Sequence, residues 1–87
     1  MITATLENWH IDYIGISSFY PGSDNFRIIG HCYGDVKGRF IGGEVICTSL
    51  ITKYNSDDGN VETLNGVYKL GNPLSNEEVA RLKELTA

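Results

Sequence analysis

The stretch EVICTSLITKYNSDDGNVETLNGVYKL, residues 44–70, decides the fold of this 87-residue chain. Near its end the pair Asn65-Gly66 separates two short runs of strand-forming residues, VETL (61–64) and VYKL (67–70). Asn-Gly is typical of a two-residue type I′ turn, because both residues tolerate the positive φ that this turn requires. The sequence therefore predicts a β-hairpin at this point.

A two-residue loop also predicts how the two arms of the hairpin pair. The expected cross-strand pairs are Leu64 with Val67, Thr63 with Tyr68, Glu62 with Lys69, and Val61 with Leu70. One face then carries the opposed charges of Glu62 and Lys69. The other face is the better candidate for the core, and it consists of Val61, Thr63, Tyr68 and Leu70.

Three further segments upstream have strand composition. Residues 8–16 partly alternate, which places Trp9, Ile11 and Tyr13 on one face. Residues 26–33 (FRIIGHCY) are short, β-branched and aromatic, and Gly30 within them indicates a bulge or a close backbone approach.

The third of these segments, residues 44–54, is the longest and is apolar on both faces. Val45, Cys47 and Ile51 point one way, whereas Ile46, Leu50 and Tyr54 point the other. A strand of this kind is normally covered on both sides, by a helix, by barrel curvature or by another subunit. Homodimerisation is therefore one expectation.

The hydrophobic period changes near the C-terminus, where a helix over about residues 76–85 is expected. Ser75 and Glu78 have the spacing of a capping box. The helix would pack one narrow apolar stripe against the sheet, formed by Val79, Leu82 and Leu85. The whole chain, residues 1–87, is predicted to be a single β-rich α+β domain. Its sheet would be antiparallel, of about five strands, and either curled or closed into a small SH3-like or OB-like barrel.

Charge and composition exclude several classes of function. The net charge is −4, and the seven basic residues are scattered, which argues against binding to nucleic acid. No segment has the pattern of a signal peptide or a membrane span, so a cytoplasmic protein is expected. Cys32 and Cys47 would then be reduced, buried thiols, and a disulfide between them is the alternative if the protein is exported. The cysteine and histidine spacing fits no metal site, and no cofactor is expected.

The sequence does not combine into a catalytic set. His10, His31 and Cys32 are candidates for acid–base or nucleophilic chemistry, but none has a partner at a telling spacing. The acidic run Asp57-Asp58-Gly59 is better explained as a polar turn than as a calcium loop. The chain is therefore not expected to be an enzyme.

Aromatic residues supply the candidate binding site. Phe19 and Tyr20 precede a Pro-Gly turn in the polar loop of residues 17–25, where large rings are often exposed. Beside Arg27 or Arg39 they would have the composition of a protein-binding hot spot, or of a base-stacking site for a small nucleotide. Local packing of the two rings is the alternative.

The second half of the chain resembles a loose group of small proteins encoded by bacteriophages and prophages. The likeness rests on Gly43 before a strand, Thr48-Ser49 within it, and the hairpin TLNGVYKLGNP over residues 63–73. The resemblance implies a small accessory protein that works inside an infected bacterium by stoichiometric binding to a host component, including host defence machinery. The leading expectation is thus an interaction protein that inhibits a host protein or defence complex. The alternative is a protein that binds or sequesters a nucleotide signal.

Overall fold

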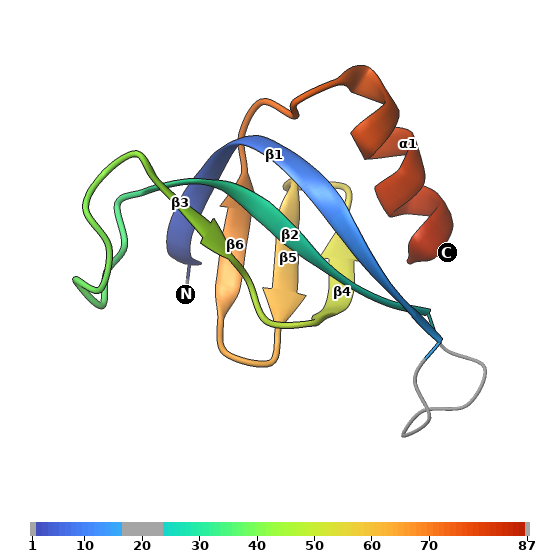
Figure 1. Ribbon diagram of the computed structural model, residues 1–87, viewed down its shortest axis with the longest axis horizontal. Coiled ribbons are helices and arrows are strands. Elements are labelled where there is room, and N and C mark those ends of the chain that lie inside the picture. Colours follow the sequence, from blue (N-terminus) through green and yellow to red (C-terminus); the bar gives the residue numbers. More distant parts are fainter. Residues whose placement is uncertain (1, 17–23, 87) are drawn as a thin grey trace.

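The computed structural model describes residues 2–16 and 24–86. These residues form six β-strands and one α-helix (Figure 1): β1 (Ile2–Ile16), β2 (Asp24–Tyr33), β3 (Glu44–Cys47), β4 (Ile51–Asn55), β5 (Asn60–Thr63), β6 (Val67–Leu70) and α1 (Asn76–Leu85). All strands belong to one mixed sheet in the order β3-β2-β1-β6-β5-β4.

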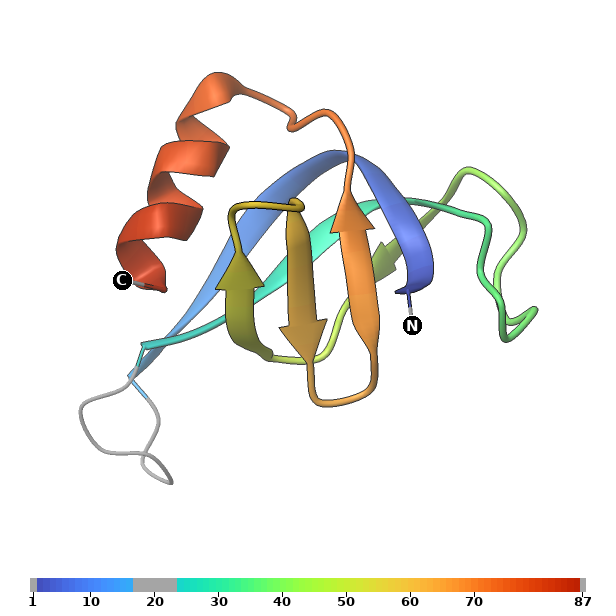
Figure 2. The same cartoon turned by 180° about the vertical axis from the view of Figure 1, so that it is seen from behind.

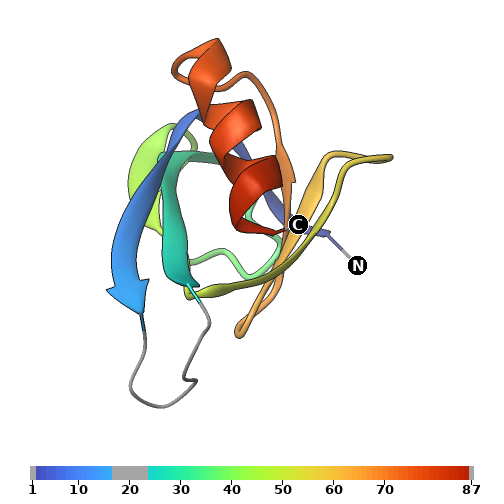
Figure 3. The same ribbon diagram turned by 90° about the vertical axis from the view of Figure 1, so that its right-hand side faces the viewer.

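The sheet is strongly curled. Figure 3 shows β2 and β3 on one side and β4, β5 and β6 on the other, with α1 running down from the top of the view. β1 joins the two sides, because its first part pairs with β6 and its longer second part pairs with β2. Figure 2 shows β4, β5 and β6 side by side. The predicted strand-rich α+β fold, with a curled sheet and one C-terminal helix, is confirmed. The sheet is not closed into a barrel, because β3 and β4 form its two edges.

The pairing between β1 and β6 is parallel, so the expectation of a purely antiparallel sheet was wrong. β1 lies between β2 and β6, and its pairs with β6 run from Ile2 with Val67 to Leu6 with Leu70. Sequence neighbours joined by short turns pair antiparallel, but these two strands are the first and the last of the chain.

β1 begins at Ile2, earlier than the predicted strand over residues 8–16. The prediction missed residues 2–7 because the strand contains a bulge at Asn8. The φ of Asn8 is 49°, in the left-handed region that Asn tolerates. The register with β2 shifts at this point. The extra residue changes the alternation, so that Leu6 and Trp9 both face the core. A strict period of two therefore misses the first part of the strand.

Trp9 joins β1 to the chain segment that follows β6. Its Nε1 donates a hydrogen bond to the carbonyl oxygen of Gly71 (3.0 Å), and its own carbonyl accepts one from the Leu74 amide (2.8 Å). On the neighbouring strand β2, a Cβ built on Gly30 would lie 3.1 Å from the Trp9 Cβ. This short distance confirms the close backbone approach that was predicted at Gly30. Trp9 and Ile11 are buried, whereas Tyr13 of the same predicted face is exposed.

The long strand predicted over residues 44–54 is wrong, since residues 48–50 separate β3 from β4. Thr48 is buried, and its Oγ1 accepts a hydrogen bond from the Ile28 amide (3.1 Å) and donates one to the carbonyl of Ser49 (2.8 Å). A side chain thus pairs with the main chain of β2 at the point where the strand ends. The chain then crosses to the opposite edge of the sheet.

The predicted β5–β6 hairpin is confirmed, but its register differs from the expected one. Val61 pairs with Tyr68, and Glu62 pairs with Val67. Each residue of β5 thus faces a partner two positions earlier in β6 than predicted, and Glu62 does not oppose Lys69. A shift of two residues keeps every side chain on its face, so Val61 and Tyr68 are buried as predicted.

The turn of this hairpin is held by a side chain. Neither Asn65 nor Gly66 has a positive φ, so the turn is not type I′. Instead, Thr63 Oγ1 accepts hydrogen bonds from the amides of Asn65 (3.2 Å) and Gly66 (3.0 Å). The Thr63 hydroxyl therefore sets the register that backbone propensity alone did not predict.

Helix α1 spans Asn76–Leu85, as predicted, and packs against β1. Its apolar stripe meets the core through Val79, Leu82 and Leu85. Ser75 is the N-cap, but its side chain makes no capping hydrogen bond; its carbonyl accepts one from the Glu78 amide (3.1 Å). In the described part of the chain, no helix is long and apolar enough to cross a membrane.

Candidate interaction surface

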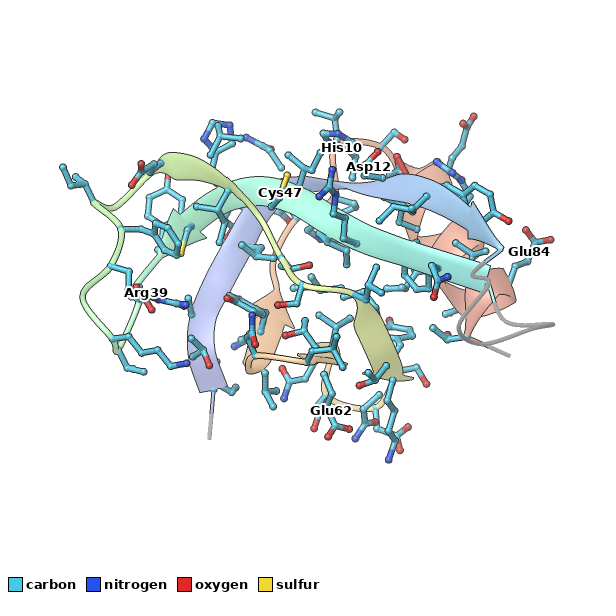
Figure 4. All side chains as sticks on the ribbon, turned by 60° about the horizontal axis from the view of Figure 1, so that its bottom comes forward. His10, Asp12, Arg39, Cys47, Glu62 and Glu84 are labelled. Carbon is cyan, nitrogen blue, oxygen red and sulfur yellow. The ribbon has the colours of Figure 1, made fainter. Side chains whose placement is uncertain are left out.

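Strands β1, β2 and β3 share an outer face, opposite the core. Directly paired residues of antiparallel strands have their side chains on the same face. The pairs on the outer face are Asp12 with Arg27, His10 with Ile29, Ile29 with Cys47, and His31 with Val45. Figure 4 shows His10, Asp12 and Cys47 close together on this side of the sheet.

The apolar part of this face lies on β2 and β3. Val45 is 57% exposed and Tyr33 is 46% exposed, while Cys47 is exposed and Ile29 is partly buried. The Tyr33 ring lies over Gly43, since a Cβ built on that glycine would be 3.5 Å from the Tyr33 hydroxyl oxygen. We call Ile29, Tyr33, Val45 and Cys47 the outer strip.

The outer strip overturns two expectations about residues 44–54. That segment was expected to be covered on both faces. In β3, only the face that carries Ile46 turns toward the core, and Val45 on the other face is exposed. Both cysteines were expected to be buried, but Cys47 is exposed. The predicted alternation holds for Val45, Ile46 and Cys47 in β3. It was wrong for Ile51 and Tyr54, which were assigned to opposite faces but both pack against the core, because the register of β4 shifts between them.

The second cysteine, Cys32, is buried in the core as expected, and both cysteines are free thiols. Burial raises the pKa of the Cys32 thiol, and the nearby negative charge of Asp35 raises it further. Since the thiolate is the reactive form of cysteine, this shift disfavours reaction at Cys32, which packs in the core.

Arg27 lies on the outer face next to the outer strip. Its Nε is 2.7 Å from Oδ2 of Asp12, with the two residues opposite each other on β2 and β1. The hydrogen bond to Asp12 raises the pKa of Arg27, and Cys47 nearby adds to the effect. The Asp12–Arg27 pair is thus a charged border beside the apolar residues.

Arg39 lies in the loop between β2 and β3, away from Arg27. Its guanidinium is 5.0 Å from the centre of the Phe40 ring, donates a hydrogen bond to the Tyr68 hydroxyl (3.4 Å) and pairs with Asp35 (3.4 Å). The hydrogen bond to Tyr68 and then that to Asp35 raise the pKa of Arg39. Figure 4 shows Arg39 at the end of the sheet remote from Asp12, so the two arginines do not form one site.

The other two predicted binding residues, Phe19 and Tyr20, lie in residues 17–23, outside the described residues.

Within the described ranges, no group of three or more His, Cys, Asp or Glu side chains could hold a metal ion. Sequence reasoning missed Tyr33 and Val45 as surface residues. The available signal was alternation, which assigns residues to faces but does not tell which face is covered.

Comparison with known proteins adds no further constraint. No family model matches this chain, and neither a curated protein nor a solved structure matches it. Inference about function therefore rests on the residues and the geometry of this chain.

Proposed function

We propose that this protein acts without catalysis, by binding another protein in fixed stoichiometry through the outer strip. The observation that carries the proposal is the exposure of Tyr33, Val45 and Cys47 on the neighbouring strands β2 and β3. Apolar surface that gathers in one place and is bordered by polar groups is typical of protein-binding sites. Here Asp12 and Arg27 supply a polar border.

The partner that we propose is a protein of a bacterial host, and a defence complex is one such target. The resemblance of residues 29–73 to phage-encoded proteins supports this origin. The net charge of −4 favours a partner with a basic surface around the contact, because complementary charges speed association and disfavour wrong partners.

The contacts of the titratable groups support a role without catalysis. Asp12 is paired with Arg27, Nδ1 of His31 lies 2.9 Å from the carbonyl oxygen of Gly43, and Cys32 is a buried thiol. A nucleophilic enzyme would place an activated nucleophile within hydrogen-bond reach of a base. These side chains instead serve strand pairing and packing.

Binding of a small nucleotide is the second candidate, and the observation that favours it is the position of Arg39 over the Phe40 ring. Arginine and aromatic side chains together can hold a base and a phosphate. A phosphate would have to compete with Asp35, which already pairs with Arg39. The outer strip therefore ranks first.

A pull-down from bacterial lysate tests the proposal. The tagged protein is compared with Val45→Lys, which places a charge in the outer strip, and with Leu74→Lys as a matched control. Leu74 is 63% exposed and precedes α1, so the control makes the same change of charge at an equally exposed apolar residue away from β2 and β3. Lysine is well tolerated on edge strands such as β3.

The expected result is one host protein at fixed stoichiometry with the wild type and with Leu74→Lys, and its loss with Val45→Lys. Burying the exposed half of a valine contributes about 1 kcal/mol, and a desolvated lysine adds a further penalty, so a loss of at least about tenfold in affinity is expected. Equal capture by all three proteins would refute the outer strip as the binding site. Release of a nucleotide on denaturation, with no captured protein, would favour the second candidate.

A further inference from the structure

The β5–β6 turn carries a chemically labile pair. Asn65 is exposed, and it is followed by Gly66, which has no side chain to hinder attack by its own main-chain nitrogen. In such a pair the main-chain nitrogen of the glycine can attack the side-chain amide carbon of the asparagine. Asparagine is among the thermolabile residues of proteins for this reason.

The structure restrains the attacking nitrogen. The Gly66 amide donates to Thr63 Oγ1 (3.0 Å), and the Asn65 amide donates to the same oxygen (3.2 Å). The Thr63 hydroxyl in turn donates to the carbonyl oxygen of Gly66 (2.9 Å). One donor and two acceptor positions are all that a hydroxyl offers, so every one of them is used to hold this turn.

We infer that Asn65-Gly66 is a site of spontaneous deamidation and isoaspartate formation, and that the Thr63 hydroxyl is a latch that slows the reaction. With the latch open, the Gly66 nitrogen loses its proton and bonds to Cγ of Asn65. The bond from Cγ to Nδ2 breaks, and the nitrogen leaves as ammonia, which carries the displaced proton. The product is a five-membered succinimide.

One water molecule then opens the ring at either of its two carbonyl–nitrogen bonds. Cleavage of the bond to Cγ leaves an ordinary aspartate at position 65. Cleavage of the bond to the main-chain carbonyl leaves isoaspartate, in which the chain continues through the side chain and is longer by one methylene. Both products add one negative charge, next to the Lys37 ammonium that donates to the Asn65 carbonyl (3.2 Å).

Gly66, the residue that follows the lengthened main chain, packs closely against β1. A Cβ built on Gly66 would lie 2.5 Å from Oγ1 of the buried Thr3, so Gly66 already fits closely against β1. Isoaspartate at position 65 would therefore disturb the contact between the hairpin and the first strand. The latch thus protects the pairing of β5, β6 and β1 from chemical ageing.

The test compares deamidation rates of four proteins incubated at neutral pH and physiological temperature: wild type, Thr63→Val, Thr63→Ser and Thr52→Val. Thr63→Val removes the hydroxyl with little change of shape, and Thr63→Ser keeps it. Thr52→Val is the matched control, because Thr52 also lies in this sheet and its hydroxyl donates to the Glu62 carbonyl on β5 (3.1 Å). Peptide mass spectrometry locates the product, and enzymatic methylation of isoaspartate counts it.

We expect Thr63→Val to deamidate at position 65 about tenfold faster than wild type. The estimate follows from the net free energy of the hydrogen bonds that hold the Gly66 amide in the wild type and are lost in the variant. Thr63→Ser and Thr52→Val should stay near the wild-type rate. Equal rates in all four proteins would overturn the inference, as would faster deamidation of Thr63→Val at other asparagines only.

A second measurement covers the case in which Thr63→Val does not fold. Hydrogen exchange of the wild-type protein reports directly on the Gly66 amide. The latch predicts slow exchange at this amide, and exchange as fast as that of a free peptide would overturn the inference.

Discussion

Gly30→Ala tests how closely β1 and β2 approach at the bulge. The added Cβ would lie 3.1 Å from the Trp9 Cβ and 3.3 Å from both the Trp9 Cα and the Glu7 carbonyl oxygen, whereas ordinary carbon contacts lie at about 3.5–4.0 Å. Two of these three atoms are main chain, and the Trp9 side chain is held by its hydrogen bond to Gly71. The strands must therefore separate by a few tenths of an ångström.

The expected cost follows from two opposing effects. Overpacking costs about 1–3 kcal/mol, and the reduced freedom of the unfolded chain returns about 0.4–1 kcal/mol, so a net loss of about 1–2 kcal/mol in the free energy of unfolding is expected. For a domain of this size the Tm should fall by about 5–15 °C. Thermal and urea unfolding followed by circular dichroism measure both quantities, and an unchanged m-value shows that the folded state is preserved.

Gly42→Ala is the control for this prediction. A Cβ on Gly42 would meet Tyr33 at 3.8 Å, an ordinary van der Waals distance. Its free energy of unfolding should stay within about 0.5 kcal/mol of wild type. If Gly30→Ala were as stable as Gly42→Ala, the close approach of β1 and β2 at Trp9 would be refuted.

Three further changes test other parts of the fold. Leu82→Ala should cost about 2–4 kcal/mol, because Leu82 is the fully buried residue of α1, and hydrogen exchange in α1 should rise more than in β1; uniform exchange would contradict this. Thr48→Val leaves the buried Ile28 amide without a partner and should cost about 1–3 kcal/mol in urea unfolding, whereas a neutral change would show that the hydroxyl does not end β3. Burial of Asp35 opposes ionisation, but hydrogen bonds, chiefly from Arg39, outweigh it and lower the pKa of Asp35. The stability that Asp35 contributes is therefore present above the pKa of the unfolded chain, about 4, and is lost as pH falls through the lowered folded value. Asp35→Asn should be less stable than wild type at pH 7, with the difference vanishing in strong acid; a difference independent of pH would refute the assignment.

The elements that local sequence predicted best are α1 and the β5–β6 hairpin. The change to a period of 3–4 residues after Pro73 locates the helix, and its stripe contacts the core as expected. For the hairpin, the faces of Val61 and Tyr68 were correct, although the register was not. Faces depend on alternation within one strand, while the register depends on the Thr63 hydroxyl, which forms three side-chain hydrogen bonds in the turn.

The candidate site was predictable only in part. Sequence composition singled out Arg27 and Arg39, which the structure places at separate positions, one beside Asp12 and one beside Tyr68. Val45 and Tyr33 are both exposed although Tyr33 lies on the interior strand β2, so their exposure follows from which face of the sheet turns away from the core, and that is a property of the whole sheet.

By itself the sequence determined the class of the fold, the positions of most strands, the C-terminal helix and the faces of the hairpin, because alternation, turn residues and helix period act over a few neighbouring residues. Only the tertiary structure decided the bulge at Asn8, the break at Thr48 and the parallel meeting of β1 with β6. Each depends on a partner remote in the sequence: Trp9 bonds to Gly71, Thr48 bonds to Ile28, and Ile2 pairs with Val67. No local pattern encodes such contacts, because each joins residues that are brought together only when the whole sheet forms.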